Sequence, residues 1–157
     1  MSTTTQSKIE ARLSELGITL PPAMAPVANY VPYVQTGNQI HISGQISMSG
    51  DTAFKGTVGT EVSLEEAQKA ARLCGINLLA QLKAATGDLD RVQRVVKLGG
   101  FVQAGPDFYD IPKVINGASD LMGEVFGEQG RHARSAVGVY KLPLNVSVEV
   151  DGIFEIA

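Results

Sequence analysis

Two charged side chains near the C-terminus could together bind a small acid. Arg134 and Asp151 each lie in a run in which apolar and polar residues alternate. A guanidinium group binds a carboxylate through two parallel hydrogen bonds, a geometry that lysine cannot reproduce. A carboxylate such as Asp151 could orient a water molecule as a general base. The pair therefore indicates a site for a carboxylate-bearing molecule, unless the two side chains simply pair with each other or across a subunit boundary.

The alternation predicts which side chains share a face. In the final run the residues of one face are Val146, Val148, Val150, Phe154 and Ile156, and those of the other are Ser147, Glu149, Asp151, Ile153 and Glu155. We expect residues 134–140 and 146–156 to form a hairpin joined by residues 142–145. Matching Val137 and Val139 with the valines of the final strand places Arg134, Ala136 and Gly138 on the face of Asp151. A recess beside the arginine, on the face without helices, is the resulting prediction.

The remaining elements must position these residues. Ser63 begins a capping box, and apolar residues recur at helical spacing until Gly87, which is typical of a long amphipathic helix. The other expected elements are a short helix over residues 9–18, a hairpin of strands 33–35 and 39–43, a strand over 92–102 with a bulge at its two glycines, and a helix over 111–126.

This order of elements predicts one α+β domain in which a mixed sheet carries both long helices on one face. Residues 1–26 are interpreted as an N-terminal arm with a short helix, and residues 27–157 as the domain. The bare face of such a sheet would be large and partly apolar, so we expect the protein to oligomerise through it.

Composition excludes several classes of function. The chain has 157 residues and a net charge of −3, which argues against a protein that grips nucleic acid. The single Cys74, in an apolar helical pattern, fits core packing in a reducing compartment. No signal peptide or membrane-spanning run is visible, so we expect a cytoplasmic protein with no membrane partner.

A metal or organic cofactor is not expected either. With Cys74, the two histidines supply too few ligands for a structural zinc site; His41 is interpreted as structural, and His132 could edge the pocket. The sequence contains no serine-hydrolase elbow and no phosphate-binding glycine fingerprint.

Two motifs resemble the YjgF/RidA family (reactive intermediate deaminases, also described as L-PSP endoribonuclease-like). One is the run Ser43-Gly44-Gln45-Ile46 after a strand. The other is Ala133-Arg134-Ser135-Ala136-Val137 followed by Leu142-Pro143 and Val148-Glu149-Val150. The likeness covers roughly residue 27 to the C-terminus, and the longer arm is typical of a longer branch of the family.

The resemblance implies a chorismate-mutase-like fold assembled as a homotrimer, with sites between subunits and no cofactor. It further implies hydrolysis of reactive enamines or imines, such as 2-aminoacrylate, to a 2-keto acid and ammonia. Arg134 matches the arginine that binds the substrate carboxylate, and Asp151 matches a position, usually glutamate, that helps hold the attacking water. The other implied substrate-binding residues are Tyr30, Ser43, Gly44 and Ala136.

Two alternatives remain open at this point. The trimer could bind a small carboxylate metabolite without catalysis, with Arg134 as a sensor. It could also be an endoribonuclease, an activity attributed to members of the family, although the acidic balance weighs against this.

Overall fold

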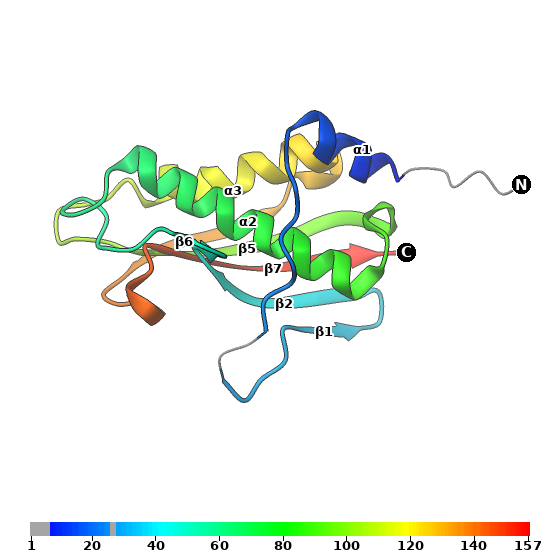
Figure 1. Ribbon diagram of the computed structural model, residues 1–157, viewed down its shortest axis with the longest axis horizontal. Helices are drawn as coiled ribbons and strands as arrows, with labels where there is room; N and C mark the ends of the chain where they lie inside the picture. The colour runs from blue at the N-terminus through cyan, green and yellow to red at the C-terminus, as the bar shows by residue number, and fades with distance from the viewer. Residues whose placement is uncertain (1–6, 26–27) are drawn as a thin grey trace, which may run out of the picture.

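A computed structural model describes residues 7–25 and 28–157 of the chain. A five-stranded mixed sheet in the order β1-β2-β7-β5-β6 is covered on one face by α2 and α3, and its other face is bare (Figure 1). Helices are α1 (Lys8–Glu15), α2 (Leu64–Thr86) and α3 (Ile111–Phe126); sheet strands are β1 (Tyr33–Thr36), β2 (Gln39–Ile46), β5 (Val92–Gln103), β6 (Ala133–Val139) and β7 (Val148–Ile156). A separate short pair is β3 (Met48–Ser49) with β4 (Thr52–Ala53), and three 3-10 turns are η1 (Leu89–Arg91), η2 (Gly127–Gly130) and η3 (Pro143–Asn145).

The predicted helices are confirmed, although the first ends at Glu15 rather than near residue 18. The hydroxyl of Ser63 accepts a hydrogen bond from the backbone N–H of Glu66, and α2 ends at Gly87 in the left-handed conformation. The apolar stripe of α3 is buried over the full predicted range, although Asp110 caps its first turn without a side-chain hydrogen bond. In the described part of the chain, no helix combines the length and the hydropathy that crossing a membrane requires.

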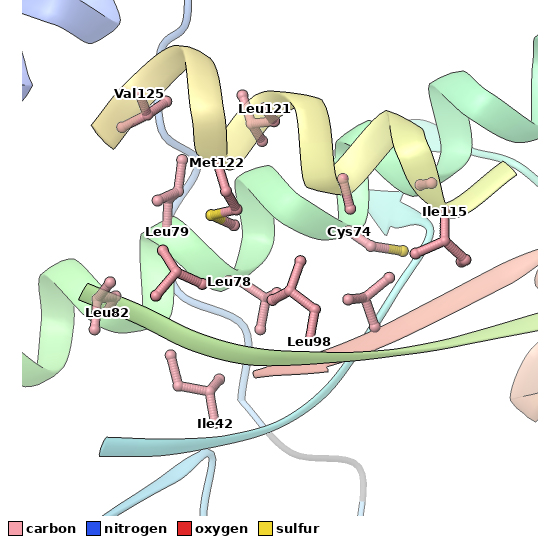
Figure 2. Close-up of a cluster of buried hydrophobic side chains, with 14 of the residues drawn as sticks. Ile42, Cys74, Leu78, Leu79, Leu82, Leu98, Ile115, Leu121, Met122 and Val125 are labelled. Atoms are coloured by element: carbon pink, nitrogen blue, oxygen red, sulfur yellow. The ribbon is translucent and has the colours of Figure 1, made fainter. Parts of the chain in front are cut away.

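The core lies between the two long helices and the sheet. Figure 2 shows Leu78 of α2, Met122 of α3 and Leu98 of β5 converging there, and Cys74 is buried among the same side chains as predicted. The helices approach each other closely at a glycine, because a Cβ on Gly117 would overlap the backbone carbonyl of Gln68. This contact fixes how α3 lies on α2.

The predicted C-terminal hairpin is wrong. β6 pairs in parallel with β5 at the edge of the sheet, whereas β7 pairs antiparallel with β5 and β2 at its centre. The first hairpin, β1 with β2, is confirmed. The predicted bulge at the glycines of β5 is also misplaced, since the register shifts occur nearer its start, between Val92 and Arg94 and between Val95 and Lys97.

The N-terminal segment is bound to the domain at both ends of its described part. The carboxylate of Asp90 accepts hydrogen bonds from the Ser7 hydroxyl and from the backbone N–H groups of Lys8 and Ile9, which begins α1. From α1 the chain crosses α2 toward β2 (Figure 1). The predicted boundary between arm and domain, at residues 26 and 27, lies outside the described residues.

Candidate functional site

A small cavity opens where β2 and β7 meet the segment before β1. Its volume is about 70 Å³, and Tyr30, Ser43, Gly44 and Glu149 contribute to its lining together with Pro143. Along β7, Glu149 alternates with the buried Val148 and Val150, so its side chain lies on the helix-free face. Three residues predicted from the sequence to bind substrate, those at 30, 43 and 44, are therefore brought together here.

A bulge in β2 presents Ser43 and Gly44 to the cavity. The pairing of β2 with β7 shifts register between Ile42 and Gln45, so the two intervening residues fall outside the regular ladder. The Ser43 hydroxyl donates to the carbonyl of Val31 at 2.8 Å and keeps its lone pairs free to accept. β-Bulges commonly re-aim side chains beside active sites. Here the bulge ties the residues after Tyr30 to the cavity wall.

The carboxylate of the cavity is that of Glu149. A Cβ on Gly44 would lie 2.6 Å from Glu149 Oε2, so only a glycine lets the carboxylate lie against the backbone there. Burial raises the pKa of Glu149, and the nearby negative charge of Asp151 raises it further. A carboxyl group with a raised pKa in a cavity is suited to accept and return a proton near neutral pH.

Asp151, the residue predicted from the sequence to hold water, is not part of this lining. It pairs with Gly99 of β5, and burial raises its pKa, partly opposed by a hydrogen bond from the Gly99 backbone and by the charge of Lys97. It shares the helix-free face with Glu149, two residues earlier. That shared face, and the place of Glu149 in the motif Val148-Glu149-Val150, are the sequence signals that point to this residue. A catalytic role for Asp151 stays a prediction.

Arg134 lies on the opposite face from the one predicted. Its partner in the parallel ladder is Leu98, a core residue, so Arg134 is on the side of the helices. Arg134 Nη1 donates to Asn116 Oδ1 at 2.8 Å and to Ser119 Oγ at 3.1 Å, both on α3. The prediction failed because alternation gives the faces of a strand but not its neighbour, and β6 joins β5 rather than β7.

The small residues that follow Arg134 make room for a helix, not for a ligand. A Cβ on Gly138 would lie 2.7 Å from Ile111 Cδ1. Ala136 packs against the core under α3. The predicted recess beside Arg134 and Asp151 is therefore absent from the part of the chain that the structure describes, and the substrate-binding role of Ala136 stays a prediction.

A series of hydrogen bonds through His132 and Ser119 orients the side chain of Arg134. His132 Nδ1 lies 2.6 Å from the carbonyl of Gly130, and because a carbonyl only accepts, that nitrogen carries the proton. His132 Nε2, 2.9 Å from Ser119 Oγ, then accepts the serine proton, and the serine oxygen accepts from Arg134. The four groups line an open hollow at the edge of the sheet. His132 thus contacts the arginine through Ser119.

Within one chain, the arginine and the carboxylate cavity are separate. Arg134 lines the hollow between β6 and α3, whereas Glu149 lines the cavity beside β2. Among residues 7–25 and 28–157, no three histidine, cysteine, aspartate or glutamate side chains are grouped closely enough to hold a metal ion. His41, predicted to be structural, is exposed in β2 with its Nε2 3.2 Å from Gln39 Oε1.

Comparison with known proteins places the chain in a family. Residues 10–155 match the family profile described as "YjgF/chorismate mutase-like, putative endoribonuclease". The chain is 48% identical over 99% of its length to protein TCP17 of Trypanosoma cruzi, covering 99% of that protein. It is 34% identical to the 2-iminobutanoate/2-iminopropanoate deaminase of Dermatophagoides farinae, over 87% of this chain and 92% of that protein.

A solved structure agrees with these relatives. The crystal structure of Atu1372 from Agrobacterium tumefaciens superposes with a TM-score of 0.88 at 53% identity, over 95% of this chain and 92% of the other. The fold is accordingly α+β and chorismate-mutase-like, with a mixed sheet and three helices. By its match to the family profile, its sequence identity to these relatives and its fold, the chain belongs to the YjgF/RidA family.

Proposed function

We propose that this protein hydrolyses a reactive 2-imino acid, or the enamine from which it forms, to a 2-keto acid and ammonia. The observation that carries the proposal is the cavity in which the half-buried carboxyl group of Glu149 lies beside Ser43, Gly44 and Tyr30. An imine carbon next to a carboxylate is already electrophilic. A site therefore needs to orient the substrate and deliver water, without a covalent nucleophile.

Glu149 supplies the proton transfers of this reaction. The imine reacts in its iminium form, protonated by solvent: the Glu149 carboxylate takes a proton from water as the water oxygen attacks the iminium carbon, which gives a neutral carbinolamine. Glu149 then gives this proton to the nitrogen. It takes the hydroxyl proton as the carbon–nitrogen bond breaks, so that ammonia leaves and the 2-keto acid forms. The raised pKa of Glu149 favours this exchange because its protonated and ionised forms are then closer in free energy at neutral pH.

The substrate carboxylate requires a cation, which we assign to Arg134 of a neighbouring copy in a homotrimer. The cavity and Arg134 lie apart in one chain, so a combined site needs two chains. The bare face carries apolar side chains that water would otherwise cover, with Val34 53% and Val137 46% exposed. Three copies joined through this face and the adjoining edge strand β6, where Arg134 is half-buried, would form three sites between subunits.

Imine hydrolysis is favoured over endoribonuclease activity by the name of one relative and by the negative charge of the chain. A relative at 34% identity is named as a 2-iminobutanoate/2-iminopropanoate deaminase. The family description also names endoribonuclease activity, but the net charge of −3 and the acidic residues of β7 on the bare face oppose binding to phosphates.

The test is release of ammonia and 2-keto acid from freshly generated 2-aminoacrylate. We expect wild type to accelerate release, and Arg134→Ala and Glu149→Gln each to lower kcat/KM about 100-fold, as loss of charge-assisted contacts predicts. Matched controls are Arg72→Ala on α2 and Glu155→Gln on β7, which change charge outside the cavity. Decay at the buffer rate with wild type, together with binding of a 2-keto acid, would instead identify a metabolite-binding protein.

A further inference from the structure

The N-terminal segment contributes a wall to the cavity. Met24 and Ala25 line the cavity although they lie in no helix or strand, and Ile46 of β2 adds a further apolar group. Methionine is flexible and fills irregular apolar space. The lining of the cavity therefore combines a carboxyl group from the sheet with apolar groups, some of which come from the N-terminal segment.

One buried side chain holds this wall in place. Gln81 of α2 is 1% exposed, and its Nε2 donates to the backbone carbonyl of Met24 at 2.7 Å. A buried amide of this kind is costly to leave unpaired, so the contact is specific to the observed path of the segment. Farther back, the ion pair between Glu10 and Lys83, at 2.6 Å, ties α1 to the same helix. The backbone of Met24 is thus held by a side chain of α2.

The small volume of the cavity limits the size of the molecule that fits beside this wall. A volume of about 70 Å³ compares with roughly 10–15 Å³ for one water molecule, so it holds about five water-sized groups. A 2-imino acid with a methyl or ethyl side chain is of this order. A longer apolar chain would meet the wall that contains Met24.

We propose that Met24, positioned by Gln81, limits the length of the apolar side chain that the site accepts. The site would then discriminate among 2-imino acids by the length of their side chains. The inference rests on the proposed function for the identity of the reacting group. Its test uses binding, so that it can succeed or fail independently of turnover.

The experiment measures binding of 2-oxobutanoate and 2-oxohexanoate by calorimetry to the full-length protein. We expect wild type to prefer the shorter acid, and Met24→Ala to shift the ratio of the two dissociation constants toward the longer acid by about tenfold, since one methylene group in an apolar pocket changes selectivity by about 10–200-fold. Gln81→Leu, which removes the hydrogen-bond donor at similar size, should shift the ratio in the same direction.

Controls separate this effect from general loosening. Met48→Ala removes the same side chain outside the cavity, and Gln68→Leu removes a donor to the carbonyl of Lys113 on the same helix as Gln81. Both should retain the wild-type ratio. An unchanged ratio in Met24→Ala and Gln81→Leu, with both variants folded by circular dichroism, would overturn the inference even if turnover is intact. A shifted ratio without any turnover would support it and refute the proposed hydrolysis.

Discussion

Arg134 and Glu149 offer a direct test of a site shared between subunits. In one chain the arginine points toward α3 and the carboxylate lines the cavity beside β2, so one copy alone does not complete the proposed site. We predict that Arg134→Ala and Glu149→Gln, each about 100-fold reduced, complement each other when the two chains are combined in one oligomer. Each variant retains the residue that the other lacks.

The expected recovery follows from how such chains would combine. If a site takes its arginine from one subunit and its carboxylate from the next, a trimer that carries both variants has one junction in which both residues are wild type. One third of the sites should then be intact, which is roughly 33-fold above the residual activity of either variant. A site contained in one chain would give no intact sites.

The assay co-expresses the two variants with different affinity tags and isolates oligomers that carry both. Ammonia release from 2-aminoacrylate is measured on this material and on each variant alone. The control oligomer combines Arg134→Ala with the double variant Arg134→Ala/Glu149→Gln, which cannot form an intact site. Activity in the mixed oligomer no higher than in this control would refute the shared site, as would a monomer on light scattering at micromolar concentration.

Three further predictions concern the groups around the site and the helix contact. Ser119→Ala should raise KM about three- to tenfold without unfolding the protein, because Arg134 loses one orienting hydrogen bond but keeps its other partner on α3; an unchanged KM in steady-state kinetics would exclude this positioning role. Glu149→Gln should raise Tm relative to wild type at about pH 7 but not at about pH 4. Burial raises the folded-state pKa of this carboxyl group, so the wild-type protein loses stability as pH rises through the interval above the unfolded pKa; an equal shift in Tm at both pH values would contradict that cause. Gly117→Ala should lower the free energy of unfolding by about 1–3 kcal/mol in urea denaturation, because the new Cβ meets the carbonyl of Gln68; Gly123→Ala on the same helix, with open space at that position, is its control.

Much of the fold follows from local signals along the chain. The capping box at Ser63 and the glycine at 87 mark the ends of α2, because they satisfy backbone groups that the helix leaves free. The apolar stripe of residues 111–126 predicts α3 with the bounds that the structure has. The alternation in β7 predicts which of its side chains are buried. Each of these signals depends only on residues close together in sequence.

Only part of the candidate site could be predicted from the sequence. Ser43 and Gly44 were identified through their motif, and Tyr30 joins them in the cavity. The resemblance indicates Asp151 as the water-holding carboxylate, whereas the structure places Glu149 in the cavity; both lie on one face of β7, and alternation does not distinguish positions two residues apart. The bulge in β2 makes that distinction by placing Gly44 against Glu149.

The sequence by itself thus determined the helices, the strands of the main sheet, the buried face of β7 and the family to which the chain belongs. Only the tertiary structure decided which strands are neighbours. Because β6 pairs with β5, Arg134 lies on the side of the helices. Ala136 and Gly138 lie on the same side and pack under α3. The physical reason is that hydrogen-bonded ladders accept any strand of suitable alternation, so the choice of partner depends on packing contacts between residues far apart in the chain.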